Sequence, residues 1–282
     1  MKQAKERIMQ VVFALCACVS ILAVILICVF LFANGVPGIA KIGPLSFFTG
    51  TTWKPGNNKF GILPMILGSI YVTGGAVLIG VPIGVLTATY MAKFCNTRVY
   101  KVMKPATELL AGIPSVVYGF FGIKVLVPMV RQVFGGDGSS ILTASILLGV
   151  MILPTIIGVI EPAIRAVPES YYEGALALGA THERSIFSVM LPAAKSGILA
   201  GIILGIGRAM GETMAVVMVC GNQPRLPAGI LKGARTLTAN IVIDMGYATG
   251  LHREALIATG VVLFVFILLI NLSFSVLKRR KV

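Results

Sequence analysis

The sequence predicts an all-α integral membrane protein with six transmembrane helices. Of its 282 residues 57% are apolar and 12% are charged, whereas about a quarter of the residues of a soluble domain are charged. Mean hydropathy is +0.94. Six stretches reach the about 20 apolar residues that a span needs. They are residues 11–33, 66–92, 107–130, 141–160, 197–219 and 255–277. A soluble enzyme, a disordered chain and a disulfide-rich secreted module are excluded.

The first span follows Lys2, Lys5 and Arg7, as the apolar part of a signal peptide would. The run is longer than 20 residues and lacks a small-residue cleavage site, so it predicts a retained anchor. We therefore expect two parts. Residues 1–60 hold a tail, the first helix and an outer loop, and residues 61–282 hold a five-helix core.

The loop charges predict which side faces the cytoplasm. Loops on the side of both termini carry 14 Lys and Arg, and the other loops carry eight. The richer side is expected to be cytoplasmic, since cytoplasmic loops are enriched in these residues. Both termini are then cytoplasmic in a multi-pass protein of the lipid bilayer. Topology accounts for the net charge of +14, and we expect no nucleic-acid partner.

The sequence lacks common nucleotide-binding and catalytic motifs. It has no GxxxxGK[ST] phosphate loop, no HExxH and no GxSxG. His182 and His252 fall on opposite predicted sides, and the five cysteines have no metal-binding spacing. We expect no enzymatic activity, no metal site and no bound cofactor in this chain, which leaves a transport or channel role.

The loop between the fourth and fifth spans, residues 161–195, is long and predicts structure of its own. Pro168 is expected at the first position of a short helix, and Gly179 is expected to end it in a left-handed conformation. One face should carry Tyr172, Ala175, Leu176 and Gly179. A second short helix is expected at residues 183–190.

Two interpretations of the first short helix remain open. It could lie on the lipid surface, or it could insert into a groove of another protein. Its small residues, Gly174, Ala175 and Ala177, favour the groove, because surface-lying helices tend to be basic and rich in Trp and Phe.

In the same loop Glu173-Gly174-Ala175 is followed after three residues by Gly179 and, after nine further residues, by Val189-Met190-Leu191-Pro192. This spacing resembles the "EAA" loop of ABC importer permeases. Only Gly174, for Ala, and Val189, for Ile, depart from the family pattern. The resemblance implies a coupling helix seated in a cleft of a separate ATPase, which binds ATP and Mg. The implied docking residues are Glu173, Gly174, Ala175, Leu176 and Gly179.

Two further stretches, residues 112–119 and 207–222, resemble the phosphate-specific branch and within it the PstC-type permease subunit. The resemblance extends from about Phe60 to the C-terminus. It implies a MetI-like type I importer permease in the bacterial cytoplasmic membrane, moving inorganic phosphate inward. The implied partners are a PstA-type permease, an ABC ATPase dimer and an extracytoplasmic phosphate-binding protein.

Alternatives to phosphate import remain open. One is a permease for another oxyanion, such as sulfate or molybdate. The other is a channel or secondary transporter that works without ATP.

The fifth predicted span contains a charge near the bilayer middle. Arg208 lies about 17 Å along the helix, where a charge costs about 2.5–3.5 kcal/mol. Glu212 follows at i+4, so the two are expected to share a face and to pair. The pair could lock two helices together, or it could form a polar patch on an anion path. Such a path would include Ser115, Tyr118 and Thr213.

Two local alternatives stay open beside this path. Ser115 and Tyr118 could donate to an anion, or they could bond to backbone near the break that Gly112 and Pro114 predict. Glycines at i, i+4 and i+8 could pack within the chain or against a second permease. These are Gly197, Gly201 and Gly205.

Overall fold

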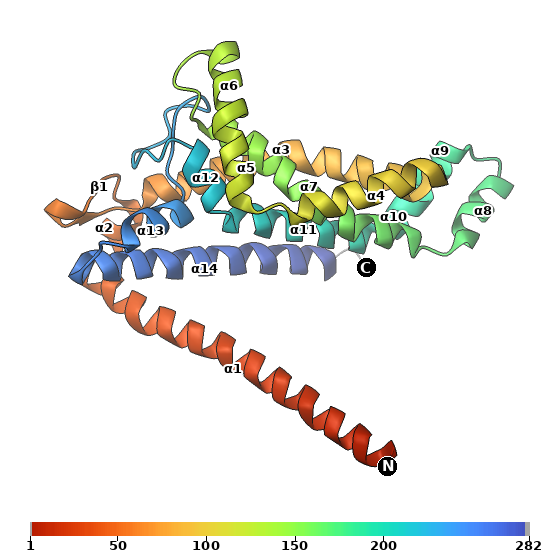
Figure 1. The fold of residues 1–282 in the computed structure, drawn as a ribbon, viewed down its shortest axis with the longest axis horizontal. Coiled ribbons are helices and arrows are strands. Elements are labelled where there is room, and N and C mark those ends of the chain that lie inside the picture. The colour runs from red at the N-terminus through yellow and green to blue at the C-terminus, as the bar shows by residue number, and fades with distance from the viewer. Residues whose placement is uncertain (1, 280–282) are drawn as a thin grey trace.

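The computed structural model describes residues 2–279 and shows an elongated helical bundle. Figure 1 shows its main helices running along the long axis. They are α3 (Leu63–Thr89), α7 (Ile141–Arg165), α11 (Lys195–Gly211) and α14 (Gly250–Arg279). Within the described residues five helices are long and apolar enough to cross a membrane, or six if the bent pair His182–Ala193 and Lys195–Gly211 counts as one span. The predicted fold class is confirmed.

Helix α7 forms the centre of the core, where α3 and α11 pack against it. Its side chains Ile152, Ile156 and Ile160 are fully buried. Glycines allow the close approach: a Cβ at Gly80 of α3 would lie 2.7 Å from the Gly149 carbonyl oxygen of α7. Gly197, Gly201 and Gly205 all face α7 in the same way. The glycine row of α11 therefore serves packing within the chain.

Helix α1 (Lys2–Ile42) is longer than the predicted span and diverges from the bundle (Figure 1). It packs mainly on α14, where Gly35 and Gly38 approach that helix closely. Lys41 Nζ lies 2.7 Å from Glu254 Oε1 at the same end. Most apolar side chains of α1 are exposed, as expected for a helix that faces lipid.

The third span is shifted from its predicted position. Helix α4 (Thr97–Gly112) is separate, and the span runs over Ser115–Phe134 instead of 107–130. Ile113 adopts an extended backbone because Pro114 disfavours a helical conformation in the residue before it. The span consists of α5 (Ser115–Phe121), the π-helical turn η3 (Gly122–Leu126) and α6 (Val127–Phe134).

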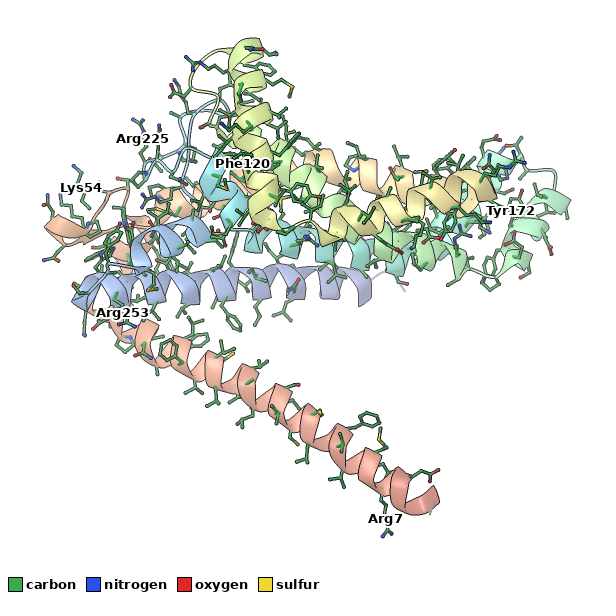
Figure 2. All side chains as sticks on the ribbon, viewed as in Figure 1. Arg7, Lys54, Phe120, Tyr172, Arg225 and Arg253 are labelled. Carbon is green, nitrogen blue, oxygen red and sulfur yellow. The ribbon has the colours of Figure 1, made fainter. Side chains whose placement is uncertain are left out.

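The bundle end opposite α8 (Glu169–Ala177) holds elements that the sequence did not predict. They are α2 (Pro44–Thr49), strands β1 (Trp53–Lys54) and β2 (Lys59–Phe60) around the turn η1 (Pro55–Asn57), and α13 (Leu237–Met245). The strands pair antiparallel. The start of α1, the end of α14 and α8 lie toward the other end of the long axis (Figure 1). Figure 2 correspondingly places Lys54, Arg225 and Arg253 far from Arg7 and Tyr172. Part of the predicted cytoplasmic tail, residues 280–282, lies outside the described residues.

Asp244 anchors the hairpin to the bundle. Its carboxylate accepts hydrogen bonds from Trp53 Nε1 at 2.9 Å and from Tyr247 Oη at 2.7 Å. Arg235 Nη1 lies 3.5 Å away, and His252 stacks on Phe60. Burial opposes ionisation of Asp244, but these hydrogen bonds and the Arg235 charge outweigh it and hold the pKa of the carboxyl below its usual value.

Candidate functional site

The fifth predicted span is broken at Glu212. Helix α11 ends at Gly211, Glu212 has an extended backbone, and α12 (Met214–Val219) follows. Glu212 Oε1 accepts the backbone N–H groups of Thr213 at 3.1 Å and Ala215 at 3.2 Å. The carboxylate therefore caps α12. The predicted continuous helix is wrong, and so is the predicted ion pair, because Glu212 has left the helix on which the i+4 spacing depends.

Arg208 is instead held by a neutral partner. Its Nη1 donates to Thr155 Oγ1 of α7 at 3.1 Å. Among the described side chains no carboxylate lies within 4.0 Å of its guanidinium. The adjacent Gly207 and the last residue of α11, Gly211, have open space where a Cβ would be. Arg208 thus lies partly buried, with donors left over, next to glycines that make no packing contact.

The break between α4 and α5 lies beside the break in the fifth span. Tyr118 Oη donates to the Leu110 carbonyl at 2.9 Å, which ties α5 to the last turn of α4. A Cβ at Gly119 would lie 3.2 Å from Ala215 Cα in α12. The Tyr118 hydroxyl thus bonds to backbone, the second alternative above. Ser115 is partly exposed, and no hydrogen bond of its hydroxyl occurs within the described residues.

The site residues therefore divide into two groups. Arg208 and Ser115 keep donors that no described residue uses, whereas Tyr118 and Glu212 hold the two breaks in place. The Thr213 hydroxyl donates to the Gly211 carbonyl at 3.2 Å and also supports the break. Sequence reasoning found these residues but missed the contact between the breaks, which depends on segments about a hundred positions apart.

The loop between the fourth and fifth predicted spans forms the predicted short helix. Helix α8 begins one residue later than expected, because Pro168 is its N-cap. Gly179 has φ +83°. Its N–H bonds to the Leu176 carbonyl at 2.9 Å, and the Ala180 N–H bonds to the Ala175 carbonyl at 3.1 Å. These two bonds form a Schellman motif and confirm the predicted glycine cap.

The second short helix is divided. It consists of α9 (His182–Ser185), the π-helical turn η4 (Ile186–Met190) and α10 (Leu191–Ala193). Thr181 Oγ1 caps its start by accepting the Arg184 N–H at 3.3 Å.

The face of α8 also differs from the prediction. Tyr172 turns toward the bundle, where its Oη lies 2.7 Å from His182 Nδ1. The expected docking residues Glu173, Gly174, Leu176 and Gly179 are exposed, and Ala175 is half-buried. Leu178 in the following turn is 90% exposed. Helix α8 therefore presents Glu173 together with small and apolar residues outward, on a face that excludes Tyr172.

A buried carboxylate near α8 was missed by the sequence analysis. Glu161, near the end of α7, has a side chain that is only 2% exposed. It accepts from Lys104 Nζ at 3.1 Å and from Tyr100 Oη at 3.2 Å, and it pairs with Arg165. The i, i+4 spacing of Glu161 and Arg165 was the available signal.

Apolar spanning helices, a polar break within them and the exposed short helix α8 at one end are features of a membrane permease subunit. Residues 80–282 match the family described as "Binding-protein-dependent transport system inner membrane component". The chain belongs to this family. It is a multi-pass permease of an ABC importer in the inner membrane, and ATP hydrolysis is carried out by a separate chain.

Known proteins of similar sequence support this membership. The probable ABC transporter permease protein YqgH of Bacillus subtilis is 40% identical, over 97% of this chain and 91% of its own length. The phosphate transport system permease protein PstC of Mesorhizobium japonicum is 34% identical, over 85% of this chain and 80% of its own. PstC 1 of Mycobacterium tuberculosis is 33% identical, over 86% and 84%.

Solved structures show the same fold. The chain superimposes on the inward-facing MetNI methionine ABC transporter with a TM-score of 0.59 at 21% identity, covering 78% of this chain and 94% of that one. A bacterial ABC transporter for alginate gives a TM-score of 0.59 at 17% identity, covering 78% and 79%. The MetI-like architecture predicted from the sequence is confirmed.

Proposed function

We propose that the chain is the PstC-type permease subunit of an importer that moves inorganic phosphate into the cytoplasm. Relatives named for phosphate transport support the substrate, whereas YqgH is named only as a probable ABC permease. The observation that carries the proposal is Arg208, a partly buried guanidinium with no carboxylate partner among the described side chains, beside two broken helices.

The chemistry of this arrangement suits a transient anion contact. Phosphate near neutral pH carries about one to two negative charges, and guanidinium donors match its oxygens. Arg208 supplies the charge and Ser115 supplies a hydroxyl group, while Thr213, whose hydroxyl donates to the Gly211 carbonyl, lines the path at the second break. Tyr118 and Glu212 shape the path by holding those breaks. A path must also release its ion, so few and weak contacts are expected.

Glu212 offers a way to prefer phosphate over sulfate. Its Oε1 accepts the two backbone N–H groups at the start of α12. Within the described residues no donor bonds to Oε2. A carboxylate oxygen can accept a hydrogen bond from protonated phosphate. Sulfate carries no proton at neutral pH and would meet only repulsion there.

The partners follow from the same proposal. A PstA-type permease completes the path, an ABC ATPase dimer that binds ATP and Mg receives α8, and an extracytoplasmic phosphate-binding protein delivers the ion. Both termini and α8 are cytoplasmic, and the hairpin end is outside. Closure of the ATPases draws the α8 helices together and opens the path outward, and hydrolysis resets it.

The test is phosphate uptake by the reconstituted complex. Arg208→Ala should lower uptake at limiting phosphate by about tenfold or more while membrane insertion and subunit assembly persist, because about 1.4 kcal/mol of lost transition-state binding gives that factor. Arg225→Ala is the matched control, since Arg225 is exposed and its guanidinium bonds to Gln223. Normal uptake by Arg208→Ala would contradict the site. Equal inhibition of labelled phosphate uptake by unlabelled sulfate and phosphate would favour a less selective oxyanion permease.

A further inference from the structure

The carboxylate of Glu161 joins two helices at the cytoplasmic end of the bundle. Lys104 and Tyr100 come from α4, and Arg165 comes from the last turn of α7. The Arg165 guanidinium also covers the Tyr100 ring, at 4.5 Å from its centroid. The Glu161 carboxylate is buried and has three partners, so its position is fixed. Losing a partner would leave its charge less compensated in a low-dielectric surrounding, which is costly.

The cluster reaches α8 through the π-helical turn η2 (Tyr90–Phe94) that ends the second span. Arg165 Nη2 donates to the Met91 carbonyl at 2.7 Å. Two residues on, Lys93 Nζ lies 2.8 Å from Glu169 Oε2 in the first turn of α8. Lys93 also lies 5.8 Å from the Tyr172 ring centroid. A displacement of α8 therefore pulls on η2 and on the end of α7 together.

The cluster reaches the broken span through α4. This helix runs from Thr97 to Gly112 and contains Pro105, which removes one backbone hydrogen bond of the helix. Tyr100 and Lys104 are bound at one end, and at the other end the Leu110 carbonyl accepts from Tyr118. Tyr118 precedes Gly119, which contacts α12 next to Glu212. Contacts between described residues thus connect α8 with the two breaks without a gap.

We propose that Glu161 is a positioning residue that transmits the movement of α8 to the broken span through α4. Glu161 does not touch the transported ion. It makes α4 follow α7 and η2 when α8 moves, so that the breaks change shape in step with the ATPase. This inference rests on the proposed docking of α8 to an ATPase and does not depend on the identity of the anion.

Glu161→Gln tests the inference in the full complex, reconstituted with its partner subunits and supplied with phosphate and binding protein. The variant keeps the size of the side chain and removes the charge that holds Lys104 and Arg165. Assembly and basal ATP hydrolysis should stay as in the wild type. Phosphate taken up per ATP hydrolysed should fall by about fivefold or more, the lower end of typical coupling between sites. The stimulation of hydrolysis by binding protein should fall with it.

Two further variants keep the result decisive. Glu254→Gln breaks the Lys41 pair at the opposite end of the bundle and should leave the ratio of uptake to hydrolysis unchanged. Lys104→Met is the second test, because that side chain is 30% exposed and the buried Glu161 carboxylate keeps Arg165 as its partner. Lys104→Met should also lower the ratio of phosphate uptake to ATP hydrolysis. Glu161→Asp keeps the charge and should therefore retain part of the ratio that Glu161→Gln loses.

Three outcomes would overturn the inference. The first is a normal ratio in both Glu161→Gln and Lys104→Met. The second is loss of assembly in Glu161→Gln with a normal ratio in Lys104→Met, which would make the cluster purely structural. The third is equal loss in Glu254→Gln. A complex that hydrolyses ATP in response to binding protein but does not carry phosphate would refute the proposed substrate alone, because the stimulation of hydrolysis still reports the coupling.

Discussion

Gly179→Ala should loosen helix α8 without creating a clash. Gly179 has φ +83°, and no atom lies within 4 Å of where its Cβ would be. The substitution therefore changes backbone conformation alone. Gly174→Ala is the matched control: the same methyl group is added in the middle of α8, again with nothing within 4 Å.

Gly179→Ala and Gly174→Ala should change the stability of α8 in opposite directions. Placing a residue with a Cβ in the left-handed region costs about 1–2 kcal/mol. Alanine also lowers the conformational entropy of the unfolded chain, which offsets about 0.4–1 kcal/mol of that cost. Gly179→Ala should therefore destabilise the Schellman cap by about 1 kcal/mol. Alanine inside a helix is better than glycine by about 0.5–1 kcal/mol, so Gly174→Ala should stabilise α8. The two variants should differ by about 1.5–2 kcal/mol, which is about 10-fold to 30-fold in the opening of α8.

Hydrogen exchange of the full chain in lipid nanodiscs measures this opening directly. Amides of residues 173–180 should exchange about fivefold faster in Gly179→Ala and more slowly in Gly174→Ala, while α7 stays unchanged. Unchanged or slower exchange in Gly179→Ala would show that the cap does not hold α8, and it would refute the reasoning from φ.

Three other predictions concern the rest of the molecule. Trp53→Phe removes a hydrogen bond to the Asp244 carboxylate and should lower stability by about 1.5–3 kcal/mol, seen as a lower thermal midpoint in detergent. Because the folded pKa of Asp244 lies below its ordinary 3.8, its contribution is complete above that pH and is lost as pH falls through the lowered pKa, so the gap between wild type and variant should close in acid. Gly80→Ala should cost about 1–3 kcal/mol against the Gly149 backbone, whereas Gly158→Ala, with open space around it, should cost less; equal midpoints would contradict the packing of α3 on α7. A reporter active only outside the cytoplasm should be active at the hairpin tip, at Asn57, and silent at the C-terminus, and the reverse would overturn the assignment of sides.

Local signals in the sequence predicted local structure well. The apolar runs located the spans, apart from the shifted third span and the broken fifth span, and Gly179 predicted the helix cap, because each signal depends on a few neighbouring residues. The break at Glu212 was not predicted, because helical spacing places Glu212 beside Arg208, whereas capping of α12 draws its carboxylate to two amides instead. The hairpin was missed because its strands have two residues each and depend on Asp244, far along the chain.

The contacts of Glu161 show the same limit for the site. Lys104 and Tyr100 lie 57 and 61 positions away from it, and no periodicity connects them. From the sequence, a single acidic residue at the end of an apolar run predicts only a position at the membrane surface. Glu161 is buried because α4 packs along α7, and the sequence does not predict that packing.

The contact between α1 and α14 has a consequence for how the chain is made. The first helix packs on the last helix through Gly35 and Gly38, which lie against Val261 and Glu254, and through Phe32, which lies against Phe264. At about 5–20 residues per second, the ribosome needs on the order of tens of seconds to produce the intervening chain. Helix α1 therefore reaches its native place only after α14 has been made, and until then it stays in the bilayer as a separate apolar segment. A chain cut short before α14 would leave it there permanently, available to any other helix that offers a matching surface.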